Sequence, residues 1–124
     1  MRALHVVLCV LSLTRFVDAA PPAREMSAVE VNKWIGFFDR LVVTVVKAQT
    51  TCEKLAFDVA RMIDANQDAV EVARNARAEG RRLPDAAQQH MRDGVMKMVP
   101  AMQKCGQHEK VRAAFAKLDL DRKR

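Results

Sequence analysis

The sequence is poor in the residues that make tight turns and in those that carry most enzyme chemistry. Its 124 residues include only four Gly, four Pro, one Trp and no Tyr. So few Gly and Pro disfavour β-sandwiches and barrels, because those folds need many tight turns. Half of the residues are apolar, which is too many for a disordered chain, and the abundance of Ala, Arg, Lys, Val and Met favours helices. We therefore expect a single all-α domain.

The first 19 residues have the three parts of a secretory signal peptide. Arg2 gives a positively charged start, residues 6–13 form a short apolar run, and Val17 and Ala19 stand at positions −3 and −1 of a cleavage site. The apolar run is too short to cross a bilayer, which needs roughly 20 residues, so we expect no transmembrane segment in the mature chain. Cleavage near Ala19 predicts an exported protein, either periplasmic or extracellular. The predicted signal peptide, short leader, helical bundle and basic tail cover residues 1–19, 20–26, 27–120 and 121–124.

Export changes how the three cysteines are interpreted, because Cys9 lies in the signal peptide. The two that remain, Cys52 and Cys105, are expected to form one disulfide, since an exported chain meets an oxidising compartment. The alternative is a zinc site made by these two cysteines and His108. It lacks the paired Cys-x-x-Cys that is typical of such sites.

The spacing of apolar residues predicts an up-and-down bundle of about four helices. Ser27 and Glu30 form a capping box at the first helix start, and Gly80 and Gly106 end the second and third helices. Pro100 lies inside the third helix and should kink it or remove one of its hydrogen bonds. The apolar stripe of this helix contains Ala87, Met91, Val95, Met98, Met102 and Cys105. The four helices are expected at 28–48, 51–79, 84–105 and 108–120.

Two features of this bundle stay open at the level of sequence. The first and second helices are either separate or continuous through Thr50 and Thr51. The second helix either runs straight to residue 79 or bends near Asn66, where polar residues interrupt its apolar pattern.

The side chains needed for catalysis are scarce. The mature chain holds one Ser, Ser27, and two His, His90 and His108, and none of them stands in a recognised catalytic frame. No glycine-rich loop is present to hold phosphates. A haem carrier would have to use Met26 and His108 as axial ligands, and neither has a supporting motif. We therefore predict no catalytic residue, no cofactor and no enzyme.

A methionine-rich segment offers an alternative function. Met91, Met96, Met98 and Met102 follow His90 closely, and thioethers can hold Cu(I) in an exported protein. All of these methionines except Met96 lie on the apolar stripe of the third helix, where Met is an ordinary core residue.

Positive charge is the remaining indication of a partner. The net charge is +6 for the whole chain, and the predicted signal peptide accounts for only one of these charges. Four arginines, Arg74, Arg77, Arg81 and Arg82, cluster near the Gly80 loop, where they could meet an acidic protein, anionic lipid or polysaccharide. Nucleic acid is not expected, because the chain is predicted to be exported and has few aromatic residues. We expect an exported, non-catalytic interaction or structural module with an unidentified protein partner; the alternative is a periplasmic carrier of copper, haem or a small ligand.

Overall fold

The computed structural model describes residues 24–48 and 51–120, and within this part of the chain it is helical, without strands. The helices are α2 (Ala28–Ala48), α3 (Cys52–Ala65), α4 (Gln67–Ala78), α5 (Asp85–Cys105) and α6 (Glu109–Ala116). The predicted all-α fold is confirmed. The count is five because the second predicted helix is two helices, α3 and α4. The predicted signal peptide, cleavage site and basic tail lie outside the described residues.

The first helix begins where the capping box places it. The Glu30 N–H donates to Ser27 Oγ at 3.2 Å, and the Ser27 N–H donates to the Glu30 carboxylate at 2.9 Å. The segment before α2 also pairs with the loop that joins α4 to α5. There, the Met26 N–H donates to the Arg82 carbonyl and the Arg82 N–H donates to the Arg24 carbonyl, both at 2.9 Å. The start of α2 therefore fixes the path of that loop.

The structure resolves both open features of the second predicted helix. Thr51 has an extended backbone, and its side chain accepts from the Lys54 N–H, so α3 begins as a separate helix. At Asn66 the chain bends, and the Asn66 side-chain amide donates to the Met62 carbonyl at 2.7 Å. A short polar side chain that bonds the backbone competes with the helical hydrogen bonds, which explains the break between α3 and α4.

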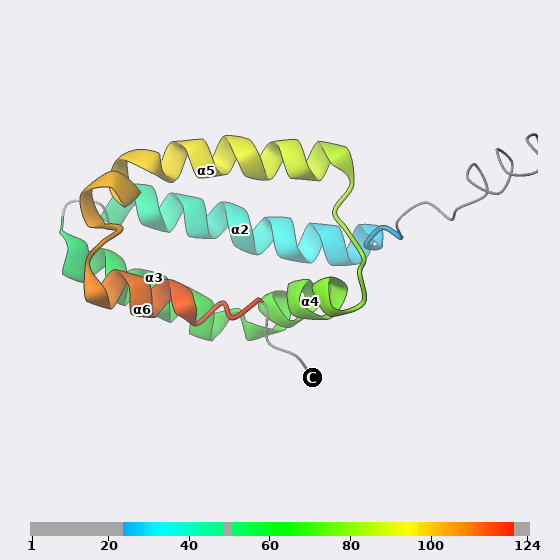
Figure 1. Ribbon diagram of the computed structural model, residues 1–124, viewed down its shortest axis with the longest axis horizontal. Helices are drawn as coiled ribbons and strands as arrows, with labels where there is room; N and C mark the ends of the chain where they lie inside the picture. Colours follow the sequence, from blue (N-terminus) through cyan, green and yellow to red (C-terminus); the bar gives the residue numbers. More distant parts are fainter. Residues whose placement is uncertain (1–23, 49–50, 121–124) are drawn as a thin grey trace, which may run out of the picture.

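The chain passes back and forth along one axis, as an up-and-down bundle requires, with α3 and α4 together making one pass. Figure 1 shows α2 and α5 running in one direction, with α3, α4 and α6 returning below them. The best-packed pairs are α2 with α3, α4 and α5, and α3 with α6. No helix in the described part of the chain is long and apolar enough to cross a membrane.

A disulfide between Cys52 and Cys105 confirms the predicted pairing. It joins the first residue of α3 to the last residue of α5, with 5.3 Å between the two Cα atoms. Because each sulfur is bonded to the other, neither thiolate is available for the zinc site considered above.

The core lies where the faces of α2 and α3 meet their neighbours. Phe37 of α2 and Ile63 of α3 are fully buried there. The apolar stripe predicted for α5 is wrong at Val95, since 48% of this residue is exposed and Gly94 is buried in its place. A Cβ at Gly94 would lie 2.6 Å from a ring carbon of Phe38, so α5 approaches α2 through its glycine. The helix continues past Pro100, which is exposed, to Cys105.

Candidate interaction surface

The arginines near Gly80 are used largely within the protein. Arg81 is mostly buried and forms ion pairs with Glu30 and Glu79. The hydrogen bond from Arg81, together with that from the Ser27 backbone, lowers the pKa of Glu30 from 4.5 to about 2. Arg82 pairs with Asp85. These contacts leave little of the predicted cluster to attract an anionic partner.

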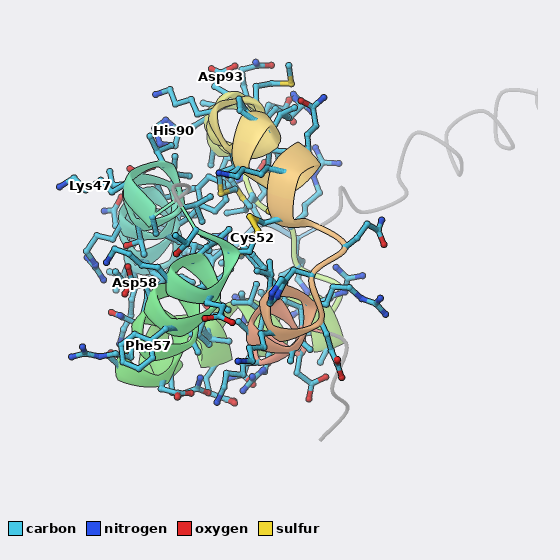
Figure 2. All side chains as sticks on the ribbon, turned by 90° about the vertical axis from the view of Figure 1, so that its left-hand side faces the viewer. Lys47, Cys52, Phe57, Asp58, His90 and Asp93 are labelled. Atoms are coloured by element: carbon cyan, nitrogen blue, oxygen red, sulfur yellow. A yellow bond between two sulfur atoms is a disulfide. The ribbon has the colours of Figure 1, made fainter. Side chains whose placement is uncertain are left out.

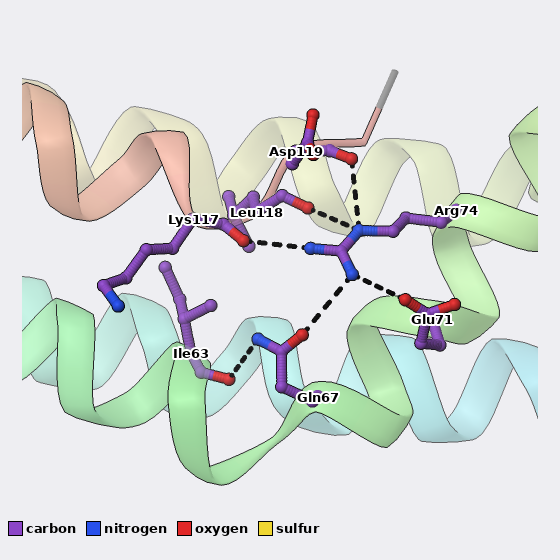
Figure 3. A network of polar contacts seen from close by, with 7 residues as sticks. All are labelled: Ile63, Gln67, Glu71, Arg74, Lys117, Leu118 and Asp119. Carbon is purple, nitrogen blue, oxygen red and sulfur yellow. Dashed lines mark hydrogen bonds and ion pairs between the residues drawn. The ribbon is translucent and has the colours of Figure 1, made fainter. Parts of the chain in front are cut away.

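Arg74 is the clearest example of an arginine whose charge is used inside the protein, because only 6% of the residue is exposed. Its guanidinium donates to the Glu71 carboxylate at 2.6 Å and to three carbonyls of the segment that follows α6 (Figure 3). These carbonyls belong to Lys117, Leu118 and Asp119, at distances of 3.0, 2.9 and 3.1 Å. A buried cation needs such partners, and here they fasten the end of α6 to α4.

The methionines of α5 are divided between core and solvent. Met98 is buried, and Met91 accepts a hydrogen bond from the Trp34 indole at 3.3 Å. Met96 is 67% exposed, as its position off the predicted stripe requires. Met96 therefore faces away from the thioethers that pack inward.

The two histidines are far from each other in the fold. His90 Nε2 lies 2.6 Å from an Asp39 oxygen on the surface of α2 and α5. His108 precedes α6, and its buried Nδ1 has no hydrogen-bond partner among the described residues. Met26 lies at the start of α2, whose 21 residues span about 30 Å, while His108 lies near the disulfide at the other end. The structure therefore does not bring Met26 and His108 together.

Within the described ranges, no three His, Cys, Asp or Glu residues gather as a metal site.

A second group of positive charges lies on α2 and α3, in a repeated pattern. Residues 40–47 (RLVVTVVK) and 54–61 (KLAFDVAR) both begin and end with a cation, and both have Leu second and Val sixth. In each segment these Leu and Val residues are buried, whereas the apolar residue at the fourth position, Val43 or Phe57, is exposed. We call the six outward residues the basic face: Arg40, Val43, Lys47, Lys54, Phe57 and Arg61.

A groove runs between the two halves of the basic face. Its volume is about 560 Å³, and all four cations line it, two from α2 and two from α3. Asp58 is the one acidic residue in its lining. Lys47, Asp58 and Phe57 project from the same side of the molecule (Figure 2).

Most of these cations have no carboxylate partner in the described chain. Lys54 pairs with Asp58 at 3.1 Å. Arg40 donates to the neutral side chain of Asn66, and the Arg61 guanidinium lies 5.6 Å from the centre of the Phe57 ring. Lys47 forms no ion pair with a described residue. The lining of the groove therefore carries a net positive charge that ion pairs among the described residues do not neutralise.

The exposed apolar side chains lie outside the groove, on either side of the cations. Val43 is 50% exposed and borders a neighbouring groove between α2 and α5. Phe57 is 61% exposed and borders another groove, between α3 and α6. Across the basic face, Val43 is therefore followed by the two cations of α2, the groove, the two cations of α3 and finally Phe57.

The sequence held a signal for this surface that periodicity alone does not reveal. The repeat of cation, exposed apolar residue and cation at identical spacing in 40–47 and 54–61 is visible once the two segments are aligned. The arginine-rich stretch near Gly80 is denser in charge, but the structure uses it internally. Comparisons with protein-family models, with curated proteins and with solved structures found no match for this chain.

Proposed function

We propose that the protein is an exported, non-catalytic interaction module and that its basic face binds an anionic partner. The predicted signal peptide supports export, as does the disulfide, because disulfides persist in oxidising compartments. The observation that carries the binding role is the convergence of four cations on one groove, three of them without a carboxylate partner among the described residues.

Electrostatics explains why this arrangement favours a partner. Like charges on neighbouring helices repel one another, and an anion placed between them relieves that repulsion. Charged residues that serve only solubility are usually interspersed with the opposite sign. Lys33, for example, lies on the same helix and pairs with Asp68 at 3.1 Å.

Two variants of equal charge can test the proposal. Lys47→Glu with Arg61→Glu reverses two cations of the basic face. Arg92→Glu with Arg112→Glu makes the same change in net charge on α5 and α6, at exposed residues outside the groove. Binding of each protein to poly-L-glutamate is measured by titration calorimetry at low salt, and thermal melts check that each variant is folded.

We expect the wild type and the Arg92/Arg112 variant to bind polyglutamate with similar affinity. The Lys47/Arg61 variant should lose at least about tenfold, because both of its substitutions remove attraction and add repulsion. Equal weakening in the two variants would show that binding follows net charge alone, which would refute a site on the basic face.

A further inference from the structure

We infer that the anionic partner is the surface of a lipid bilayer that contains anionic headgroups. This inference rests on the proposed function, and it identifies the kind of partner that the basic face fits. Two exposed apolar side chains of the basic face, Val43 and Phe57, point to a bilayer by where they lie relative to the cations.

Charge alone does not distinguish a bilayer from an acidic peptide. A peptide lying in the groove would contact its cationic lining from α2 and α3. It would not reach Val43 or Phe57, because neither residue lines that groove. The exposed apolar side chains would then remain in water on both sides of the bound peptide.

A flat surface laid across α2 and α3 would contact both parts of the pattern. The cations would meet lipid phosphates, and Val43 and Phe57 would face the acyl boundary beside them. Binding of a protein to a membrane interface grows with the apolar area that it buries and with the attraction of its Lys and Arg residues to anionic lipids. Long basic side chains can also bury their methylene groups while their charged ends reach the headgroups.

The repeat gives each helix the same means of contact. Lys54 and Arg61 flank Phe57 at the same spacing at which Arg40 and Lys47 flank Val43. The buried Leu and Val residues of both segments fix which side of each helix faces outward. The packed α2–α3 pair therefore presents two rows of this pattern side by side, in opposite directions, and both rows are already helical.

The test is binding to vesicles, with the protein purified as the cell processes it. Vesicles of phosphatidylcholine alone are compared with vesicles containing about one third phosphatidylglycerol, by co-sedimentation at low salt. The charge variants are those described above. A third double variant, Val43→Ser with Phe57→Ser, removes the apolar side chains. Its control is Val95→Ser with Met96→Ser, which alters two exposed apolar residues of α5.

We expect binding to the anionic vesicles only. Each cation near an anionic leaflet changes affinity about fivefold, so reversal of Lys47 and Arg61 should cost at least about 25-fold. The Val43/Phe57 variant should lose about tenfold, because its apolar contact is gone. Both control variants should stay within about threefold of the wild type.

The outcomes separate this inference from the proposed function. If the wild type binds polyglutamate but not anionic vesicles, the bilayer is overturned and an acidic protein becomes the partner. If the Val43/Phe57 variant binds vesicles as tightly as the wild type, the flat contact is refuted. If the wild type binds neither probe, both proposals fail. All four substituted residues of the basic face are exposed, and single variants at Lys47 and Phe57 replace any double variant that does not fold.

Discussion

Replacing the buried Arg74 should release the C-terminal helix. In Arg74→Met the aliphatic part of the side chain is largely kept, whereas the hydrogen bonds to the segment after α6 and to Glu71 are lost. Hydrogen bonds that involve a charged group contribute about 1.5–3 kcal/mol each when they are well buried. Here Lys117 and Asp119 are exposed, so water can replace part of what is lost. We expect a net destabilisation of about 2–3 kcal/mol and a fall in Tm of roughly 10–15 °C.

Urea unfolding measures the total loss, and amide hydrogen exchange shows where it occurs. The amides of α6 should exchange faster in Arg74→Met than those of α2, because Arg74 fastens α6 directly. Arg112→Met is the matched control, since Arg112 is exposed on α6 itself, and it should change stability by less than about 0.5 kcal/mol. A loss of under about 1 kcal/mol in Arg74→Met, with unchanged exchange in α6, would refute the role assigned to this network.

Three further predictions concern other parts of the fold. Replacing Cys52 and Cys105 by Ala removes a crosslink between residues 53 apart in sequence, and the loop-entropy model predicts that the free energy of urea unfolding falls by about 4 kcal/mol. An unchanged urea midpoint would contradict this prediction. Gly94→Ala should lower the free energy of urea unfolding by about 1–3 kcal/mol despite the better helix propensity of Ala, because the new Cβ meets the buried ring of Phe38. A variant more stable than the wild type would show that α5 can shift away from α2. Because the pKa of Glu30 is lowered from 4.5 to about 2 in the folded protein, its ionised form stabilises the fold above pH 4.5, and this stabilisation is lost as the pH falls toward 2. The difference in unfolding free energy between the wild type and Glu30→Gln, measured by urea unfolding at a series of pH values, should therefore shrink over that range. A constant difference would count against the ion pair.

The parts of the fold that sequence predicted are those set by neighbouring residues. The start of α2 follows from Ser27 and Glu30, which are three positions apart and satisfy each other's backbone groups. The bend at Asn66, which the sequence left open against a straight helix, is local too, since its side chain bonds a carbonyl four residues earlier. The Cys52–Cys105 bond is a long-range contact, but only two cysteines remain once Cys9 is assigned to the predicted signal peptide.

The parts that sequence missed depend on distant segments. The charge of Arg74 looked available to a partner because its partners in the segment after α6 lie more than 40 positions away. The buried face of α5 was placed wrongly at Val95, because the close approach at Gly94 is set by Phe38 on another helix. The basic face was missed for the same reason: it exists only when the α2–α3 hairpin brings 40–47 beside 54–61.

The most direct test of the central claim compares two proteins of identical net charge. The affinity for poly-L-glutamate is measured for the Lys47→Glu/Arg61→Glu variant and for the Arg92→Glu/Arg112→Glu variant. If the basic face is the binding surface, the first should bind at least about tenfold more weakly than the second. Equal affinities would contradict it.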